Sequence, residues 1–475
     1  MKNKKFLLVL VVLLTAVALA ACSSSAATST PTTVPTSTAV IETAVATQAG
    51  PGTPPNGTPP NGTPPNGMPP NGGPTGGGPS GGSASVETGT GVVLLTDGQT
   101  LSGGTYTSTN ADENAIRAEG AITASLESVT VEKTAGAASN NDASSFYGLN
   151  AAILALDNAV LNITGGTVTA TAEGANGVFA YNGATIHISD TVITVTGGNA
   201  GGIEVAGGGI MVATNLTVNS TVKAAIRSDR GGGSMTIDGG SYTTSGSSGA
   251  PAIYSTADII VNNATLTAHT SEAVVVEGFN SVTLNNCNVT GNMSGVFGDS
   301  SSENIHNVML YQSMSGDAAQ GTSSFTMTGG TLVSQNGDMF YVTNTSSVIK
   351  LNKVSLTLAD GAYLLLVAGN DGARGWGTAG ANGGKAAFNV SEQVLSGNIK
   401  VDALSTLEMS LSNASSFTGS INSDGTQAAS LAVTMDATSS WTLTADSYIS
   451  AFNGSLDNVE TNGFKLYVNG VAVKG

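Results

Sequence analysis

The sequence predicts an all-β solenoid with three short strands in each coil of about 24 residues, and three observations support this prediction. The chain has 63 glycines and only 10% charged residues, with abundant Thr, Ser, Asn, Ala and Val, which favours short strands separated by turns. Pairs of apolar residues recur at near-constant spacing, and a Gly- or Asn-containing turn follows most pairs. Long amphipathic helical patterns are absent from the sequence, so one repetitive unit is expected from about Thr90 to Gly475.

The first 21 residues have the features of a secretory signal peptide. Three lysines lie within the first five residues, an apolar run extends from Phe6 to Leu14, and small residues precede Cys22. The apolar run is short for a membrane span. The alternatives are an ordinary signal peptide with a chance cysteine and an uncleaved anchor.

The end of this segment, Leu19-Ala20-Ala21-Cys22, resembles the lipobox of bacterial lipoproteins. The resemblance implies that Cys22 is diacylated on its sulfur and becomes the N-terminus after cleavage. We therefore expect an exported lipoprotein that is attached to a membrane through its lipid and exposed at the cell surface.

Residues 22–89 are expected to form a disordered spacer. They are rich in Ser, Thr, Pro and Gly, and a Gly-x-Pro-Pro-Asn pentad occurs four times from Gly52 to Asn71. Such a composition cannot bury a core, and paired prolines favour extended backbone. A ligand for a proline-recognition module is the alternative reading, but such modules are not expected outside the cell.

The mature charge argues against nucleic acid as a partner. Removal of the signal peptide leaves 12 basic and 32 acidic residues, a formal charge of −20. Only Cys287 remains besides Cys22, so no intramolecular disulfide is expected.

The first strand of each coil is predicted from two inward apolar positions that are separated by one residue. The second strand follows a tight turn, such as Gly165-Gly166 or Asn263-Ala264. The first strands are predicted to begin their inward set at Leu161, Ile186, Ile210, Met235, Ile259, Val282, Phe325 and Ile349. The second strands are predicted to place inward Val168, Ile193, Leu216, Tyr242, Leu266, Val289, Leu332 and Leu356.

A third short strand is predicted to close each coil. Its inward members are expected at Ile116, Leu154, Val178, Ile203, Ile226, Ile253, Val275, Val296, Phe340 and Leu364. Three strands per coil describe a solenoid in which neighbouring coils pair at about 4.8 Å.

The coil length, the three-strand rhythm and the Asn/Gly turns resemble right-handed parallel β-helix proteins of the pectate-lyase-like architecture. The handedness is implied by the resemblance alone. Residues 372–475 are similar to the closing part of adhesin-like bacterial surface proteins, with matching stretches at 372–378, 395–399, 415–421, 441–449 and 463–470. We expect residues 387–475 to form closing coils and a cap, because Trp441, Tyr448, Phe464 and Tyr467 gather there. This architecture hosts lyases, hydrolases, adhesins and binding proteins alike.

Catalytic β-helices need clustered carboxylates, and the sequence has no Asp-Asp pair. Asp229 with Arg227 and Arg230 is expected to lie near Glu204 if the third strands align; ordinary turn chemistry is the alternative. The three histidines do not share a register, so no metal site and no cofactor is predicted.

A ladder of threonines is predicted directly after the second inward row. It comprises Thr169, Thr194, Thr217, Thr243, Thr267, Thr290 and Thr357, with Val333 at one position. The functional interpretations are that these hydroxyls bond to a polysaccharide or that they order water. The structural interpretation is that threonine has a high β propensity and suits the exposed face of a sheet.

Three departures from the repeat predict loops at 132–147, 299–324 and 369–385. The last two are expected to emerge at the same edge, two coils and about 10 Å apart. Together they offer Tyr311, Met314, Asp317, Arg374 and Trp376, and an exposed aromatic beside Arg and Asp suits a sugar or a protein partner. Packing of Trp376 against the solenoid wall is the alternative.

We therefore expect a monomeric, non-catalytic adhesin-like or carbohydrate-interacting protein of the cell surface, whose partner is a polysaccharide or a component of a host or neighbouring cell. A polysaccharide lyase or glycoside hydrolase is the alternative, and a structural spacer of the envelope is a third.

Overall fold

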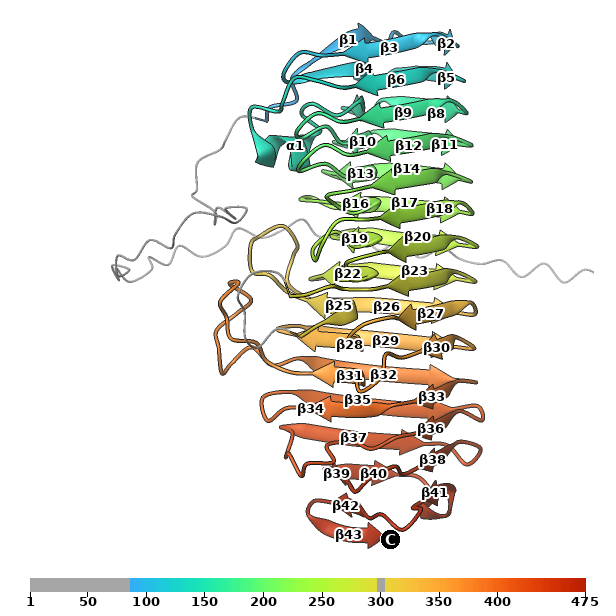
Figure 1. Ribbon diagram of the computed structural model, residues 1–475, viewed down its shortest axis with the longest axis vertical. Coiled ribbons are helices and arrows are strands. Elements are labelled where there is room, and N and C mark those ends of the chain that lie inside the picture. Colours follow the sequence, from blue (N-terminus) through green and yellow to red (C-terminus); the bar gives the residue numbers. More distant parts are fainter. Residues whose placement is uncertain (1–85, 297–303) are drawn as a thin grey trace, which may run out of the picture. The chain divides into compact units, whose positions relative to one another are not determined.

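The computed structural model describes residues 86–296 and 304–475. These residues form a right-handed parallel β-helix with three strands in each regular coil. Figure 1 shows the coils stacked in sequence order, from β1 in blue to β43 in red. The predicted signal peptide, Cys22 and the predicted spacer, apart from residues 86–89, lie outside the described residues.

Sheet A contains the strands that were predicted as third strands. Its order is β1 (Thr90–Leu94), β4 (Glu113–Glu119), β7 (Ile153–Leu156), β10 (Val178–Tyr181), β13 (Ile203–Ala206), β16 (Ile226–Ser228), β19 (Ile253–Ser255), β22 (Val274–Glu277), β25 (His306–Tyr311), β28 (Asp338–Thr343), β31 (Tyr363–Val367) and β34 (Asn398–Val401).

Sheet B contains the predicted first strands and has the largest number of strands among the described residues. Its order is β2 (Thr100–Ser102), β5 (Thr123–Glu127), β8 (Val160–Thr164), β11 (Thr185–Ser189), β14 (Gly209–Thr214), β17 (Gly233–Asp238), β20 (Asp258–Asn262), β23 (Ser281–Asn285), β26 (Thr322–Thr328), β29 (Ser346–Asn352), β32 (Lys385–Ser391), β35 (Thr406–Ser412), β37 (Ser430–Met435) and β40 (Ala451–Asn453).

The third wall is divided into sheets C and D. Sheet C has the order β3 (Thr105–Ser108), β6 (Thr130–Lys133), β9 (Thr167–Ala170), β12 (Val192–Val195), β15 (Thr217–Ser220), β18 (Ser241–Thr244), β21 (Thr265–Ala268), β24 (Asn288–Gly291), β27 (Thr331–Ser334) and β30 (Ser355–Thr357). Sheet D has the order β33 (Val394–Ser396), β36 (Ser416–Thr418), β38 (Ser440–Thr442) and β41 (Val459–Glu460).

The last coils are closed by sheet E, with β39 (Ser447–Ile449), β42 (Leu466–Val468) and β43 (Val471–Lys474). Here β42 pairs with β39 in parallel and with β43 in antiparallel orientation. Trp441 is fully buried and stacks on Phe417, and Tyr448 stacks on Tyr467 with ring centroids 4.5 Å apart. Trp441, Tyr448 and Tyr467 therefore pack at the closing end, whereas Phe464 of the same predicted group is exposed.

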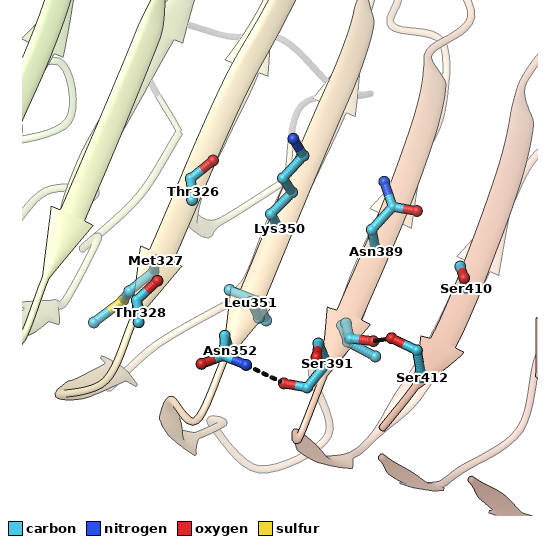
Figure 2. A pocket seen from close by; sticks show the side chains of 11 residues that line it. Thr326, Met327, Thr328, Lys350, Leu351, Asn352, Asn389, Ser391, Ser410 and Ser412 are labelled. Atoms are coloured by element: carbon cyan, nitrogen blue, oxygen red, sulfur yellow. Dashed lines mark hydrogen bonds between the residues drawn. The ribbon is translucent and has the colours of Figure 1, made fainter. Parts of the chain in front are cut away.

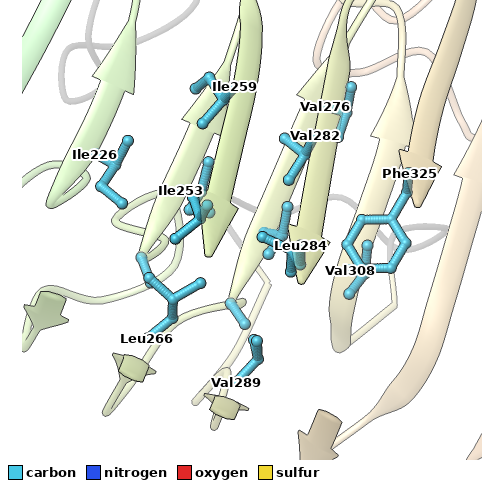
Figure 3. Packing of buried hydrophobic residues seen from close by; sticks show 14 of the residues in the cluster. Ile226, Ile253, Ile259, Leu266, Val276, Val282, Leu284, Val289, Val308 and Phe325 are labelled. Atoms are coloured by element: carbon cyan, nitrogen blue, oxygen red, sulfur yellow. The ribbon is translucent and has the colours of Figure 1, made fainter. Parts of the chain in front are cut away.

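The interior is a continuous apolar core between the three walls. In Figure 3, Ile226 and Ile253 from sheet A, Leu284 from sheet B, and Leu266 and Val289 from sheet C belong to one buried cluster. All five side chains are completely buried. Full burial of each such side chain stabilises the fold by about 1.5–3 kcal/mol. Rows of buried apolar residues in successive coils therefore stabilise the solenoid without disulfide bonds.

The corner between sheet B and the third wall is set by backbone conformation. In twelve coils the first residue of this corner has positive φ, where glycine and, to a lesser degree, Asn and Asp are tolerated. They are Gly103, Ser128, Gly165, Asp190, Asn215, Gly239, Asn263, Asn286, Gly329, Lys353, Glu392 and Asn413. Side chains of neighbouring corners also bond to each other, as Asn215 donates to Asp190 at 2.7 Å.

This corner explains one wrong register in the predicted first strands. Asn215 stacks on Asp190, so Ile186 pairs with Met211 and not with Ile210. Ile210 is 40% exposed, while Met211 is buried. Because apolar residues occupy four consecutive positions, 210–213, their alternation does not identify the inward set.

The predicted third strands need similar corrections. Ile153, Val274 and Leu365 pair with the inward ladder, where Leu154, Val275 and Leu364 were expected. The predicted member Val296 lies outside any strand, and Val308 of β25 takes its place in the ladder. The predicted loop 299–324 therefore contains β25, and its residues 322–324 belong to β26. Its residues 299–303 lie outside the described residues.

The predicted loop 132–147 is also partly regular. Glu132 and Lys133 belong to β6, and residues 141–147 form the helix α1 (Asn141–Tyr147). Asn140 caps this helix by accepting hydrogen bonds from the backbone N–H groups of Asp142 and Ala143. A short 3-10 helix, η1 (Leu456–Asn458), precedes β41. No helix within residues 86–296 and 304–475 is long and apolar enough to cross a bilayer.

Candidate functional site

The predicted loop aromatics lie against the outward face of sheet A. Tyr311 is the last residue of β25, and its ring lies 4.8 Å from that of Trp376 in an edge-to-face arrangement. The two predicted loops therefore meet, as expected. Of the two interpretations that the sequence left open, the structure has the packing of Trp376 against the solenoid wall and not an exposed aromatic, because Tyr311 is 7% and Trp376 is 5% exposed. Their neighbours Val275, Met309 and Tyr341 form a second apolar cluster under the loop 369–384.

Backbone contacts explain why this glycine-rich loop folds down. Asn370 and Asn382 each donate from their side-chain amide to the carbonyl oxygen of Trp376, at 3.1 Å and 2.8 Å. The guanidinium carbon of Arg374 lies 4.1 Å from the ring centroid of Trp376. Arg374 therefore covers the indole from outside, and this face of Trp376 is not open for stacking on a sugar.

The other two predicted loop residues differ in exposure. Asp317 accepts from Arg230 at 2.6 Å, so its carboxylate is engaged within the protein. Met314 is 47% exposed and has a positive φ of 67°. Of the five predicted ligand contacts, Met314 is thus on an open surface, and the other four are held by contacts within the protein.

A cluster of buried charges lies on the same face of sheet A. Glu204 and Arg227 are neighbours on β13 and β16, with 3.6 Å between Oε1 and Nε. Arg227 also forms an ion pair with Asp229. The sequence-based expectation that these residues converge is therefore confirmed. Lys223 lies close enough to Glu204, Arg227 and Asp229 for their charges to affect its pKa. Its ammonium donates to the hydroxyl of Ser145 in α1 at 3.3 Å, so α1 contacts this cluster of charges.

Burial controls the protonation of this cluster. It raises the pKa of Glu204 to about 8, although the positive charge of Arg227 opposes this shift. It lowers the pKa of Lys223 to about 8. Both carboxyl oxygens of Glu204 lack a hydrogen-bond partner, and 3.6 Å is too long for a hydrogen bond. Glu204 is therefore a neutral carboxyl in the folded protein at neutral pH. The positive charge of Arg227 is balanced by Asp229.

A second buried carboxyl fixes the loop 312–321. Glu277, at the end of β22, accepts from the hydroxyls of Tyr254 at 2.5 Å and Tyr311 at 3.0 Å, and also from Ser313. Burial raises the pKa of Glu277, and these three donors oppose that shift. Glu204 and Glu277 are both completely buried, so neither carboxyl is accessible to a polymeric substrate in this conformation.

The threonine ladder on sheet C differs from its prediction at one position. Thr194 of β12 pairs with Asn219 of β15, so Asn219 and not Thr217 belongs to the predicted row. Thr217 lies instead in a second outward row beside Val192 and Ser241. This second row also contains Thr130, Thr167, Thr265, Asn288, Thr331 and Ser355. The register slip has the same cause as at Ile210, since both residues lie in the same coil.

An open depression with a volume of about 300 Å³ lies on the outward face of sheet B. Its central row is Thr326, Lys350, Asn389 and Ser410, one residue from each of the strands β26, β29, β32 and β35. Figure 2 shows these side chains side by side on adjacent strands, with the head group of Lys350 extending away from the strand. Lys350 is exposed and no acidic residue lines the depression.

A second row borders the depression near the corner. It consists of Thr328, Asn352, Ser391 and Ser412. Asn352 donates to the backbone carbonyl of Ser391 at 2.9 Å, and Ser412 donates to that of Val390 at 3.0 Å, which orients both side chains (Figure 2). Rows along neighbouring coils are spaced by about 4.8 Å, and alternate residues of one strand by about 6.6 Å. The depression is therefore a regular grid of hydroxyl, amide and ammonium groups.

Sequence reasoning did not single out these residues. Lys350 and Asn389 look like any solvent-facing position of a strand, and only their adjacency across two coils distinguishes them. No group of three or more His, Cys, Asp or Glu side chains in the described ranges could hold a metal ion. Comparison with protein-family models and with curated proteins found no match for this chain, so its assignment stays at the level of the parallel β-helix fold.

Proposed function

We propose that the protein is an exported, lipid-anchored protein of the cell surface that binds carbohydrate without cleaving it. The depression on sheet B is the observation that carries this proposal. It is open, and hydroxyl, amide and ammonium groups line it in two rows. Such groups can exchange hydrogen bonds with sugar hydroxyls, whereas hydrolysis of a glycosidic bond requires two accessible carboxyl groups. The lining contains none.

The features of the N-terminus support the location. The lipobox-like sequence before Cys22 and the proline-rich residues 52–71 fit a binding domain that is held away from a membrane. Substitution of Cys22 by serine tests this part. It should release the protein from the membrane fraction into the medium, while retention of the variant in that fraction would contradict lipid anchoring.

Binding is tested with a glycan and polysaccharide array and the soluble chain of residues 23–475. The double substitution Lys350→Ala/Asn389→Ala should weaken binding of any retained polymer at least about tenfold, equivalent to about 1.4 kcal/mol. The matched control is Asn162→Ala/His187→Ala, which alters the same outward row on β8 and β11. Equal binding by both variants and the unsubstituted chain would refute the depression as the site.

An enzyme of the polysaccharide lyase or glycoside hydrolase class is the second candidate. The observation in its favour is the convergence of Glu204, Arg227 and Asp229. Each polymer that binds should therefore be assayed for new reducing ends and for unsaturated products. Product formation that is lost in Glu204→Gln would replace the binding proposal by an enzymatic one.

A further inference from the structure

The wall formed by sheets C and D is interrupted at one place. Sheet C ends at β30 and sheet D begins at β33, and no ladder hydrogen bonds join these two strands. Sheets A and B remain paired across the same two coils, through β31–β34 and β29–β32, although the pairing of β31 with β34 shifts in register between Tyr363 and Leu365. The interruption is therefore local, and it concerns one wall of one step in the stack.

Gln393 replaces part of the missing ladder. Its side-chain Oε1 accepts from the backbone N–H of Val354 at 2.8 Å, and its Nε2 donates to the carbonyl oxygens of Val354 at 2.7 Å and Val394 at 2.9 Å. The amide thus serves both strands at the corner. It does not reach the residues farther along β30 and β33.

Those residues direct backbone groups into the interruption. In a parallel sheet the N–H and C=O of one residue point to one neighbouring strand, and those of the next residue point to the other. Ser355 bonds toward β27 through Gly330, and Leu395 and Gly397 face β36. Leu356 and Ser396 therefore turn their N–H and C=O groups toward each other's coil, where no strand pairs with them.

A cleft with a volume of about 780 Å³ lies at this interruption. This volume is within the range of about 300–1,000 Å³ that ligand sites occupy. The residues 358–362, between β30 and β31, form one side, whereas Gly397 alone separates β33 from β34. The connection therefore has five residues in one coil and one residue in the next, and the cleft lies where the two differ.

The lining of the cleft combines polar groups and apolar side chains, such as the exposed Val394, with one accessible aromatic ring. Ser355, Thr357, Ser396 and Asn398 contribute hydroxyl and amide groups. Tyr363 is 38% exposed. Asp360 is the one charged residue among the lining residues. Hydroxyl, amide and backbone groups with a phenol ring suit a hydroxyl-rich ligand without negative charge, because the cleft holds no cation and Asp360 would repel an anion.

The depression on sheet B spans four coils, and the cleft lies on the adjacent wall at the two middle coils of these four. The corner between them is occupied by Lys353 and Glu392, whose side chains form an ion pair of 2.9 Å. Both residues have positive φ, 55° and 50°, which costs energy for residues other than Gly, Asn and Asp. Charged residues thus stand at this corner where most other coils have Gly, Asn or Asp.

We infer that the depression and the cleft are two parts of one binding track, in which a linear neutral polysaccharide runs across the solenoid corner beside the Lys353–Glu392 ion pair. This inference rests on the proposed carbohydrate binding and adds the second subsite and the ligand class. The chain path from Asn389 to Ser396 spans seven residues, or at most roughly 23 Å at about 3.3 Å per residue. In this inference a ligand of two sugar units occupies one part, and a longer oligosaccharide occupies both together.

The test is a length series of neutral linear oligosaccharides from two to eight units, using cello-, xylo-, manno- and N-acetylated chito-oligosaccharides. Oligogalacturonides of the same lengths provide the acidic comparison. Affinities are measured by calorimetry with the soluble chain of residues 23–475. We expect affinity for one neutral series to rise steeply with length, and the acidic series to bind more weakly.

Two variants separate the subsites. Ser355→Trp fills the cleft, and its control Ser241→Trp alters the same outward row of sheet C, where the ladder is continuous. Ser355→Trp should reduce affinity for six to eight units at least tenfold and leave the binding of two units unchanged. Lys350→Ala/Asn389→Ala should weaken binding at every length. Tyr363→Ala removes the ring without filling the cleft, and it decides the matter if Ser355→Trp unfolds.

The possible failures are distinguishable. If no oligosaccharide or polymer binds, the proposed function itself fails. If binding depends on Lys350 and Asn389 but is the same in Ser355→Trp, Tyr363→Ala and Ser241→Trp, the binding function stands and the track is refuted. Preference for the acidic series would refute the neutral ligand class.

Discussion

Arg230 places its guanidinium on the ring of Phe146, with 4.0 Å between the guanidinium carbon and the ring centroid. Arg230 follows β16 and Phe146 belongs to α1, so this contact attaches the helix to the wall. The same guanidinium donates to Asp317 in the loop 312–321 at 2.6 Å and 3.1 Å. One exposed side chain thus joins two segments that are far apart in the sequence.

Arg230→Met should therefore loosen both segments while leaving the solenoid folded. The stacking and the exposed ion pair are each worth about 1 kcal/mol or less, so global stability should fall by less than about 2 kcal/mol. Hydrogen–deuterium exchange should accelerate in residues 141–147 and 312–321. Asp317→Asn serves as the control and should accelerate exchange in the loop alone; unchanged exchange in both variants would contradict the bridging role.

Glu204 should make stability depend on pH. Its pKa is raised from 4.5 to about 8, so between these values the folded protein binds more protons than the unfolded chain. Stability then falls as pH rises, by at most about 1.4 kcal/mol for each pH unit. Glu204→Gln keeps the shape without the proton and should flatten this dependence.

The measurement is urea unfolding of both proteins between about pH 5 and about pH 7.5. The upper limit avoids the range where Lys223 loses its own proton, since its pKa is about 8. Equal slopes for the unsubstituted protein and Glu204→Gln would show that the carboxyl is already ionised in the folded state.

Trp376 should matter for stability and not for glycan binding. It is 5% exposed and packs on Tyr311, and truncation of a buried Trp costs about 3–5 kcal/mol. Trp376→Ala should therefore lower the midpoint of thermal unfolding and expose residues 369–384 to proteolysis, whereas Trp376→Phe should do so less. Retained stability together with lost glycan binding would instead support the ligand role predicted from the sequence.

Gln393 should contribute to the stability of the fold, because its side-chain amide bonds to the backbone at the interruption between β30 and β33. Gln393→Leu leaves the N–H and C=O of Val354 without their present partners, and each unsatisfied group costs about 1–3 kcal/mol when water cannot replace the bond. The control is Gln335→Leu at an exposed position, where a change within about 0.5 kcal/mol is expected. Chemical denaturation compares the two, and equal effects would mean that water substitutes fully in the cleft.

The positive-φ residues at the corner between sheet B and the third wall predict that two reciprocal substitutions change the stability by different amounts. Lys353→Asn relieves positive-φ strain but removes the ion pair with Glu392, so stability should change by less than about 1 kcal/mol. Asn263→Lys introduces the strain and removes the bond to Asp238, and it should cost about 1–2 kcal/mol. Denaturation midpoints test this, and a loss for Lys353→Asn as large as that for Asn263→Lys would contradict it.

The repeat could be predicted because inward and outward residues alternate on sheet B and the third wall. Leu161, Ile186 and Met235 are buried as predicted, each in a strand with polar or exposed neighbours. Sheet A could not be predicted as well, because α1 and the loops cover its outward face. Strands such as β7 and β22 are buried on both faces, so buried and exposed residues do not alternate along them. The sequence alone therefore does not distinguish the inward Ile153 from its neighbour Leu154.

The candidate sites were harder to predict than the fold. The convergence of Glu204 and Arg227 followed from strand order, but their enclosure under α1 did not, because a seven-residue helix has too few turns to show a period. Trp376 was singled out as an aromatic in a glycine-rich loop, and its burial depends on the contacts of Asn370 and Asn382. The cleft depends on a missing ladder between β30 and β33. The spacing of apolar residues along the sequence does not show whether two successive strands pair.

The interruption between β30 and β33 also has a mechanical consequence. Coils in a solenoid contact only their neighbours, so tension along the axis is carried in series through every step. At most steps three ladders share the load, but here only those of sheets A and B do. Sheet A ends at β34, so only the ladders of sheets B and D join the coils of β32, β35 and β37, apart from an isolated bridge between Ile399 and Ile421. We expect a solenoid stretched in an optical trap to yield first at one of these steps with two ladders, and a ligand chain bound across the step between β30 and β33 would strengthen that step.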